Sequence, residues 1–383
     1  MKGVTKGNIK KYALNEFLTE YKELNTYNKY RPVAVGRYGI RKRESIYSKE
    51  LAKDYSKNKL IHKGTLTVGM GSKQIDIGIL IEDETFAVSP AYHTYEIQGI
   101  RCKYLEYCLQ SKNIEMFSLY AKRGSRQGKS IDLKRWLTYK IPVYSEKDQI
   151  VIEENLNKIN YVIELRRKQI DLLDELVKAR FVEMFGDPIE NQKDWEVVKI
   201  RDIVTDVRYG TSKPAVEGGR YPYLRMNNLT VDGGLDLSDL KYIDIPDNEI
   251  EKCVVRKGDI LFNRTNSIDL IGKTAVFNLL DDMVIAGYII RIRLNNQILP
   301  DVFSQYMNLE AMKKVLRGMA KGAVNQANIN AQELQSIKVY IPNMELQKQY
   351  VEFKEEIDKS RLRELLAIKH IKLLLNDSWL LFY

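Results

Sequence analysis

One stretch of the chain ends like a phosphate-binding loop. Residues 267–274, SIDLIGKT, close on the Gly-Lys-Thr with which such a loop holds the phosphates of a nucleotide. The loop should open on glycine and lead from a strand into a helix. This stretch opens on Ser267 and runs into residues 275–278, AVFN, which are short and β-like. We therefore do not expect the chain to hydrolyse nucleotides.

Other catalytic centres also lack their residues. An adenine methyltransferase needs an Asn/Asp-Pro-Pro-aromatic motif, and no two of the nine prolines are adjacent. The histidines His62, His93 and His370 are scattered and share no helical face, which argues against a zinc site or a histidine acid–base centre. The three cysteines lack metal-ligand spacing and are expected to be reduced thiols. We expect no catalytic residue and no metal site.

Charge and hydropathy favour a soluble chain that binds a polyanion. The formal net charge is +10, and residues 101–145 hold ten Lys or Arg against three acids. Such a surface suits nucleic acid, because each phosphate neutralised by Lys or Arg releases counterions. No apolar run is long enough to span a membrane, and no apolar stretch follows the basic N-terminus. We expect a cytoplasmic protein.

The sequence contains an internal repeat with a period of about 200 residues. Residues 61–68, IHKGTLTV, match residues 255–262, VRKGDILF, and both predict a basic-glycine turn that leads into a strand. Each half continues with a helical segment, a basic-glycine loop and a polar turn that contains glutamine. Each half closes on Ile-Pro, at residues 141–142 and 341–342. The repeat predicts two domains of the same fold.

Beyond each Ile-Pro the apolar period changes to three and four, which is typical of a long helix. The first helix is expected at about residues 150–184, roughly 52 Å long, and ends at the Gly-Asp-Pro of residues 186–188. The second stripe superposes on the first at an offset of 198, and Arg166, Arg361 and Glu364 interrupt the stripes. We expect the helices to pack on each other as a coiled coil. The alternative is that each packs on a local core.

Several segments resemble one protein family. The end of the first helix, residues 172–187, is similar to the central spacer of the DNA-specificity subunits of type I restriction–modification systems. The second half adds further family-like pieces: YGTSK at 209–213, LRMNNL at 224–229, KGDILFNR at 257–264 and NQANIN at 325–330. The resemblance covers nearly the whole chain, although residues 1–60 match nothing clearly.

The resemblance implies an α+β fold with a pseudo-two-fold internal repeat. Two tandem target-recognition domains, β-rich with peripheral helices, are separated by two long helices that pack as an antiparallel coiled coil. We expect the first domain at residues 1–145, a spacer helix at 146–187, the second domain at 188–343 and a C-terminal helix at 344–383. Within the first domain, residues 8–24 show a short helical period.

The resemblance also implies partners. The chain would recognise a bipartite double-stranded DNA target and bind two methyltransferase subunits and a restriction or translocase subunit. It would itself need no cofactor, because S-adenosylmethionine, ATP and Mg are expected only on the partner subunits. Helices of roughly 52 Å would place the half-site centres about one helical turn of DNA apart.

Polar loops in both halves carry the residue types that contact DNA. Arg, Asn and Gln read base edges, while Lys, Arg and hydroxyl groups bind phosphates. The expected DNA-binding residues are Ser72, Lys73, Gln74, Lys122, Arg123, Arg126, Gln127, Lys129, Lys213, Arg225, Asn227, Arg264, Thr265, Asn266, Ser267, Lys321, Asn325 and Gln326. Asn325 has the alternative role of capping the next turn. The expected partner-binding residues lie on the apolar stripes: Leu156, Ile163, Ile170, Leu173, Ile357, Ile368 and Ile371.

Two other functions remain open. One is a non-catalytic partner-binding or inhibitory protein of the same fold, with vestigial DNA recognition. Salt-dependent DNA binding would distinguish it from a specificity subunit. The other is a one-chain restriction–methylation enzyme, which the missing motifs and the short length disfavour.

Overall fold

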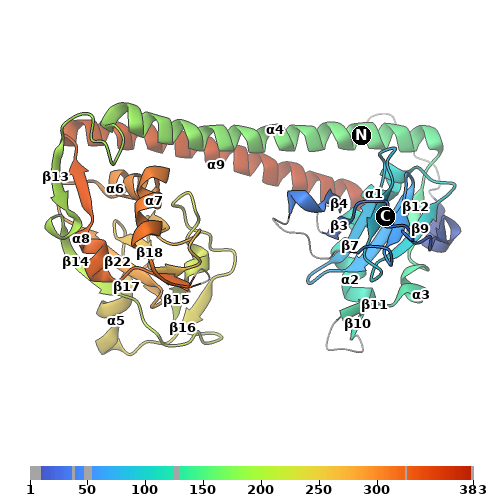
Figure 1. Ribbon diagram of the computed structural model, residues 1–383, viewed down its shortest axis with the longest axis horizontal. Coiled ribbons are helices and arrows are strands. Elements are labelled where there is room, and N and C mark those ends of the chain that lie inside the picture. The colour runs from blue at the N-terminus through green and yellow to red at the C-terminus, as the bar shows by residue number, and fades with distance from the viewer. Residues whose placement is uncertain (1–9, 37–38, 47–53, 124–128, 324–325, 381–383) are drawn as a thin grey trace. The chain divides into compact units, whose positions relative to one another are not determined.

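The computed structural model describes residues 10–36, 39–46, 54–123, 129–323 and 326–380. The chain divides into two compact units: unit 1, Met1–Leu165 with Ala367–Tyr383, and unit 2, Arg166–Leu366. Two long helices, α4 (Glu146–Phe185) and α9 (Met344–Leu380), belong partly to each unit (Figure 1). These helices cover the segments whose apolar period predicts them.

The ends of the long helices are satisfied by short-range hydrogen bonds. At the start of α4, the Asp148 N–H donates to Ser145 Oγ at 3.2 Å. At the start of α9, the Glu345 N–H donates to Asn343 Oδ1 at 2.8 Å. Both are side-chain caps for N–H groups that have no partner within the helix. After α4, the Gly186 N–H donates to the Val182 carbonyl at 2.8 Å, as a glycine cap does.

Within unit 2, α4 and α9 pack directly on each other. Arg166 Nη1 lies 2.5 Å from Glu364 Oε2, and the Phe181 and Tyr350 rings meet edge to face at 5.4 Å. Arg166 contacts Glu364, and the later Phe181 contacts the earlier Tyr350. The two helices therefore run antiparallel. The apolar stripe and its polar interruptions therefore form contacts between the helices, as the coiled-coil prediction requires.

Unit 1 is built on a four-stranded antiparallel sheet of order β2-β9-β6-β7. These strands are β2 (Leu18–Glu20), β6 (Thr65–Met70), β7 (Ile75–Ile79) and β9 (His93–Ile97). Helices α1 (Cys102–Ser111), α2 (Asn113–Tyr120) and α3 (Leu133–Trp136) contribute to the unit. Leu66, Ile77, Tyr104 and Trp136 lie in its core, and Leu156 of α4 joins them.

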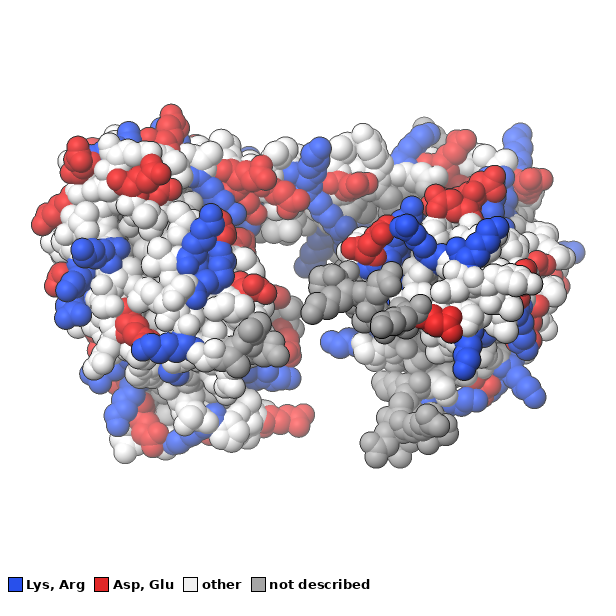
Figure 2. Space-filling model, in the orientation of Figure 1, with Lys and Arg blue, Asp and Glu red and all other residues white. Residues whose placement is uncertain are grey.

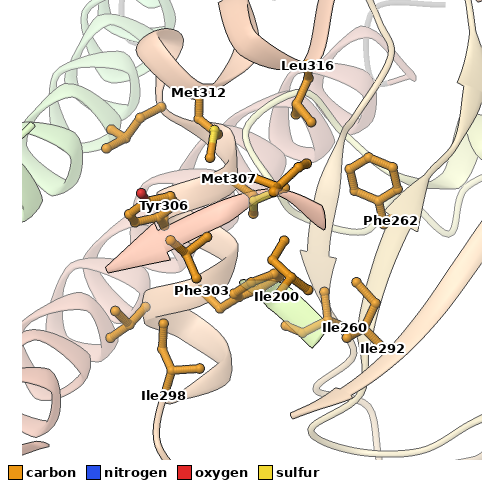
Figure 3. Packing of buried hydrophobic residues seen from close by; sticks show 14 of the residues in the cluster. Ile200, Ile260, Phe262, Ile292, Ile298, Phe303, Tyr306, Met307, Met312 and Leu316 are labelled. Atoms are coloured by element: carbon orange, nitrogen blue, oxygen red, sulfur yellow. The ribbon is translucent and has the colours of Figure 1, made fainter. Parts of the chain in front are cut away.

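Unit 2 has a sheet of the corresponding order, β14-β22-β18-β20. The strands are β14 (Val204–Tyr209), β18 (Ile260–Asn263), β20 (Thr274–Val276) and β22 (Ile289–Leu294). The helices are α5 (Asp247–Cys253), α6 (Pro300–Asn308), α7 (Glu310–Met319) and α8 (Ala331–Ser336). Ile260 and Ile292 of the sheet share one core with Phe303 of α6 and Leu316 of α7 (Figure 3).

Shorter strands complete each unit. The described residues of unit 1 also form four two-stranded antiparallel sheets: β1 (Lys10–Ala13) with β12 (Lys140–Val143), β3 (Val33–Gly36) with β4 (Gly39–Lys42), β5 (Lys59–Ile61) with β8 (Phe86–Val88), and β10 (Ala121–Arg123) with β11 (Lys129–Ile131). In unit 2, β13 (Glu196–Lys199) pairs with β25 (Lys338–Ile341). A second sheet has the order β16-β15-β21-β17: β16 (Lys241–Ile243), β15 (Tyr221–Leu224), β21 (Met283–Ile285) and β17 (Val254–Val255). A third has the order β19-β24-β23: β19 (Thr265–Asn266), β24 (Gln326–Asn328) and β23 (Lys321–Ala323).

The internal repeat is present in the topology. In both units the first strand pairs with the last strand before the long helix, β1 with β12 and β13 with β25. The matching sequence turns also have the same backbone: Gly64 has φ +86° and Gly258 has φ +92°, a region that side chains other than glycine rarely adopt. Each glycine precedes the corresponding central strand, β6 or β18. The repeated sequence therefore specifies a repeated fold.

The short helix expected near residues 8–24 is wrong. In the part described, residues 10–20 form β1, a 3-10 turn at Leu14–Glu16 and β2. Leu14 and Leu18 are buried as a helical stripe would bury them. However, β1 pairs with β12 and β2 pairs with β9. Long-range strand pairing therefore overrides the local apolar period.

Candidate nucleic-acid interface

In unit 2, two of the predicted polar loops come together at the end of the main sheet. Strand β19 follows β18 and pairs with β24, so that Thr265 lies opposite Asn328. The Thr265 hydroxyl donates to Asn328 Oδ1 at 2.8 Å. Strand β24 turns back from β23, which begins at Lys321. The segment 264–267 and the strands 321–323 and 326–328, which are distant from it in sequence, thus form one surface. Asn325 lies outside the described residues.

A buried asparagine that the sequence argument missed holds this surface in place. Asn263 has no exposed surface, and its Nδ2 donates to the carbonyl oxygens of Thr265 and Tyr288, each at 3.1 Å. Its Oδ1 accepts a hydrogen bond from Asn266 Nδ2 at 2.8 Å. Part of the hydrogen-bonding capacity of Asn266 is therefore used inside the protein. The only sign of Asn263 in the sequence is that a polar residue stands at the end of an apolar strand.

The predicted cations of unit 2 differ in their electrostatic surroundings. Lys213 pairs with Glu249 at 2.8 Å, Arg225 with Asp239 at 2.9 Å and Lys321 with Glu333 at 2.5 Å. Arg264 has no such carboxylate among the described residues, and its guanidinium carbon lies 4.9 Å from the centroid of the Tyr209 ring. Lys and Arg side chains lie among Asp and Glu side chains on the visible face of the molecule (Figure 2).

The predicted loop around Asn227 is held by buried polar groups. Asn227 itself is exposed. Its neighbour Asn228 is buried, accepts the Arg225 N–H at 2.8 Å and donates to the Asp236 carbonyl at 2.8 Å. Lys273 is also buried and donates to the Met226 and Leu229 carbonyls at 2.7 and 2.6 Å. The loop can therefore present Asn227 from a fixed backbone.

The phosphate-loop resemblance of residues 267–274 has a structural explanation instead. The stretch leads into strand β20 and not into a helix. Its lysine, Lys273, uses its ammonium group to bind backbone carbonyls of the neighbouring loop, and burial lowers its pKa. Among the described residues, no group of three or more His, Cys, Asp or Glu is placed to hold a metal ion.

In unit 1, the predicted residues lie on two hairpins. Ser72 and Lys73 are exposed in the turn between β6 and β7, and Gln74 follows them, half-buried. Lys122 is exposed on β10, where Arg123 lies opposite Lys129 of β11. Arg126 and Gln127 lie outside the described residues. The basic segment 101–145 is also partly neutralised, because three of its cations form ion pairs: Arg101 with Glu153, Lys103 with Glu106 and Lys112 with Glu115.

A cleft of about 520 Å³ lies beside the β6 strand of unit 1. Met70, Tyr92, His93 and Ser130 contribute to its lining, together with Val33 and its neighbours on β3. Burial lowers the pKa of His93, and the nearby Lys59 adds to this effect. His93 was predicted only to be one of three scattered histidines, and none of these cleft residues was expected to form a site. In the sequence, the segment SPAY that ends at Tyr92 stands at the place in the first half that IAGY, ending at Tyr288, holds in the second.

The predicted partner-binding residues are covered to different degrees by this chain. Leu156, Ile163 and Ile368 are buried, and Leu156 lies in the unit 1 core. The other four are half-buried: Ile170, Leu173, Ile357 and Ile371. Other leucines on the same helices are exposed within unit 2: Leu172 and Leu176 on α4, and Leu362, Leu365 and Leu366 on α9. These exposed leucines were not predicted, and they leave more apolar surface accessible to a partner than the stripe residues do.

None of the described helices is both long enough and apolar enough to cross a bilayer.

Comparison with known proteins identifies related chains. Residues 192–370 match the family described as type I restriction modification DNA specificity domain. The chain is 32% identical over 173 residues to the proposed type I restriction enzyme MjaX specificity subunit of Methanocaldococcus jannaschii, covering 44% of this chain and 40% of that protein. It is 21% identical over 233 residues to the type I restriction enzyme EcoKI specificity subunit of Escherichia coli, covering 57% and 50%. The matched stretches thus span half or less of these relatives' own length.

Similarity of fold extends over the whole chain. A chain from a structure solved to explain complex assembly and conformational transition of the type I restriction–modification system aligns with a TM-score of 0.56. The alignment covers 98% of this chain and 97% of that chain, with 16% sequence identity. At that identity the match concerns the fold, and it includes both units.

Proposed function

We propose that this chain, whose residues 192–370 match the type I restriction modification DNA specificity domain, is the sequence-specific DNA-binding subunit of a type I restriction–modification complex. In this proposal each unit binds one half of a bipartite double-stranded target. The chain works in the cytoplasm beside the DNA that it reads.

The repeated topology carries the proposal. Both units contain a four-stranded sheet of corresponding order, and both place predicted polar residues at the ends of the central strands. Two copies of one DNA-binding fold in one chain suit a target with two separate halves. The sheet and its hairpins position polar side chains, while phosphate and base contacts would supply affinity and sequence preference.

The chemistry is proposed to lie on partner subunits. Methylating a base within a duplex requires that the base be turned out of the stack into an active site. A methyltransferase subunit would do this and would hold S-adenosylmethionine, while a restriction or translocase subunit would use ATP and Mg. We assign no catalytic residue and no cofactor to this chain. Its role is to hold the DNA in the correct place.

The long helices offer a surface for such partners. The exposed leucines of unit 2, Leu172 and Leu176 on α4 and Leu362, Leu365 and Leu366 on α9, follow helical spacing. Rows of this kind are typical of helices that bury a second apolar face against another protein. We propose that methyltransferase subunits, two in number, dock on α4 and α9.

A selection experiment tests the proposal. The purified chain, alone and with the methyltransferase subunit of a type I system, is incubated with a library of random duplexes, and the bound fraction is sequenced. The expected result is one enriched motif in two parts separated by unspecified bases. A control library of single-stranded DNA should give no such motif. Recovery of bound DNA without any sequence preference would contradict the proposal.

A second function is favoured by the ion pairs of the predicted cations. Because Lys213, Arg225 and Lys321 each have a carboxylate partner, the same fold could serve as an inhibitory or partner-binding protein with vestigial recognition domains. That function predicts DNA binding that is weak at all salt concentrations. A specificity subunit should instead bind tightly at low salt and lose affinity steeply as salt rises.

A further inference from the structure

Arg264 occupies an unusual position on the surface of unit 2. It follows strand β18 directly, and its guanidinium carbon lies over the Tyr209 ring, 4.9 Å from the ring centroid. Nη1 lies 3.4 Å from the Gly287 carbonyl, to which it donates. Nε is buried and has no hydrogen-bond partner in the described structure. The side chain is therefore held over the ring, and it can offer only the outer, Nη end of the group to a ligand.

Within the part of the chain that the structure describes, the charge of Arg264 is uncompensated by a carboxylate, whereas Lys213, Arg225 and Lys321 each pair with one. A cation paired with a carboxylate must break that pair to bind an anion with full strength. Arg264 instead rests on an aromatic face, which stabilises a guanidinium group and leaves its charge available. An arginine that is fixed in place and free of acidic partners is suited to bind an external anion.

Tyr209 is itself fixed from two directions. Its hydroxyl accepts a hydrogen bond from the Ala331 N–H at 2.8 Å, at the start of α8. The next residue, Gly210, passes so close to the Ile285 and Ala286 carbonyls that any Cβ at this position would collide with them. Tyr209 is 43% exposed, and the nearby Tyr288 is 50% exposed. The ring under Arg264 is thus rigidly placed at the molecular surface.

We propose that Arg264 binds a phosphate of the DNA backbone as a sequence-independent anchor, and that Tyr209 is the residue that positions it. The proposal rests on the proposed DNA-binding function and assigns one mode of contact within it. A side chain that reads bases must extend into a groove roughly 8.5 Å deep. Arg264 lies against the protein surface, where the phosphodiester backbone would pass. Its Nη groups are the bidentate donors that phosphate oxygens accept.

The anchor belongs to unit 2 alone. In the sequence repeat, residues 61–68 align with residues 255–262, which places Met70 at the position of Arg264. Met70 carries no charge and lines the cleft of unit 1. The two halves of the DNA target would therefore be held by different contacts, and the loss of one phosphate contact in unit 2 has no counterpart in unit 1.

The test compares four variants of the full chain on two duplexes. The variants are Arg264→Ala, Arg264→Lys, Tyr209→Leu and Tyr209→Phe, and the duplexes are the motif selected by the wild type and a scrambled duplex of equal length. Dissociation constants are measured over a range of salt concentrations, and thermal unfolding confirms that each variant is folded. The matched control is Arg208→Ala, because Arg208 lies on the same strand as Tyr209 and is paired with Asp206.

Arg264→Ala should weaken binding to both duplexes by the same factor, about tenfold, which is the effect of one charge-assisted hydrogen bond. It should also reduce the slope of log affinity against log salt by about 0.9, the value for one phosphate. Arg264→Lys should keep the slope and lose part of the affinity, because lysine cannot stack flat. Tyr209→Leu should weaken both duplexes with the slope retained, and Tyr209→Phe should restore most of that loss. Arg208→Ala should change neither affinity by more than about twofold.

Two results would overturn the inference. A loss confined to the selected motif would show that Arg264 reads a base. Unchanged affinity and unchanged salt slope in Arg264→Ala would show that the stack with Tyr209 is only structural. If the wild type bound both duplexes equally well, the proposed specificity would fail. The experiment would still test the phosphate contact of Arg264, because the predicted loss of affinity is also measured on the scrambled duplex.

Discussion

Replacement of a buried lysine in unit 2 should stabilise the protein in a pH-dependent manner. Lys313 of α7 is only 8% exposed. Its Nζ donates to the Gly272 carbonyl and, at 2.7 Å, to Asn308 Oδ1. This contact supports the base of the loop that follows Arg264. Burial lowers the pKa of Lys313 from 10.5 to about 7, and the positive charge of Arg317 contributes to the shift.

The structure allows the size of the effect to be worked out for Lys313→Met. A pKa lowered from 10.5 to about 7 corresponds to roughly 5 kcal/mol against the charged form in the folded chain. Methionine removes that cost and loses two hydrogen bonds, each worth about 1 kcal/mol. Neither acceptor is left alone, because the Thr274 hydroxyl also donates to the Gly272 carbonyl at 3.1 Å and the Thr274 N–H to Asn308 Oδ1 at 3.3 Å. At pH 6 the variant should be more stable by roughly 3 kcal/mol.

The sign of the pH dependence follows from the lowered pKa. Between about pH 7 and pH 10.5 the unfolded chain binds the proton and the folded chain does not. The free energy of unfolding of the wild type therefore rises with pH in this window, relative to the variant. The advantage of Lys313→Met should shrink from pH 7 upward. Above pH 10.5 it should become a deficit of about 2 kcal/mol, from the lost hydrogen bonds.

The assay is urea unfolding of the full chain at several pH values, with hydrogen exchange of the α7 amides as the probe for unit 2. The matched control is Lys314→Met, since Lys314 is the exposed neighbour on the same helix. The control should change stability by less than about 0.5 kcal/mol at every pH. A Lys313→Met variant that is less stable than the wild type at pH 6, or whose effect does not change with pH, would refute the reasoning.

Two further substitutions test the scaffold. Glu364→Arg should destabilise unit 2 by about 1 kcal/mol, because it places two guanidinium groups together where Arg166 now pairs with a carboxylate. The double variant Arg166→Glu with Glu364→Arg should restore stability. A double-mutant cycle by urea unfolding measures the coupling energy of the pair. A coupling near zero would show that the pair contributes nothing. Gly210→Ala should cost more than about 2 kcal/mol, because its Cβ would collide with the Ile285 carbonyl. A thermal melt measures this loss, and a melting temperature equal to that of the wild type would contradict it.

The long helices and the repeat could be predicted because their signals are local or long. The apolar period that predicts α4 runs over about residues 150–184 of a 40-residue helix, and Gly186 marks the helix end. A pattern of this length predicts a helix whatever the details of tertiary packing. The N-terminal segment shows the opposite case. Leu14 and Leu18 have helical spacing, but β1 pairs with β12 across more than a hundred residues of sequence. No local pattern records a partner that distant.

The candidate interface was predictable only in part, because its electrostatics depend on residues that are distant in sequence. The types of the polar residues indicated where DNA contacts are expected. Their electrostatic state depends on partners far along the chain, such as Glu249 for Lys213 and Glu333 for Lys321. The stack of Arg264 on Tyr209 joins the ends of two different strands. Sequence therefore indicates which side chains are available for binding, and the fold decides which of them keep a free charge.

The repeat preserves the scaffold, while aligned positions on the two surfaces carry different side chains, as Gly69 and Asn263 do. In unit 1, Gly69 leaves room for the Tyr92 ring to lie against the strand, where any Cβ would collide with it. The Tyr92 hydroxyl then donates to the Val35 carbonyl at 2.8 Å. In unit 2, Asn263 stands at the aligned position and donates to the Thr265 and Tyr288 carbonyls, and the Tyr288 side chain is 50% exposed. Glycine and asparagine at this aligned position thus accompany a half-buried Tyr92 in unit 1 and an exposed Tyr288 in unit 2, with the strand order unchanged. If each unit reads one half-site, the two halves of the target should differ in sequence, because the same fold presents different side chains to each.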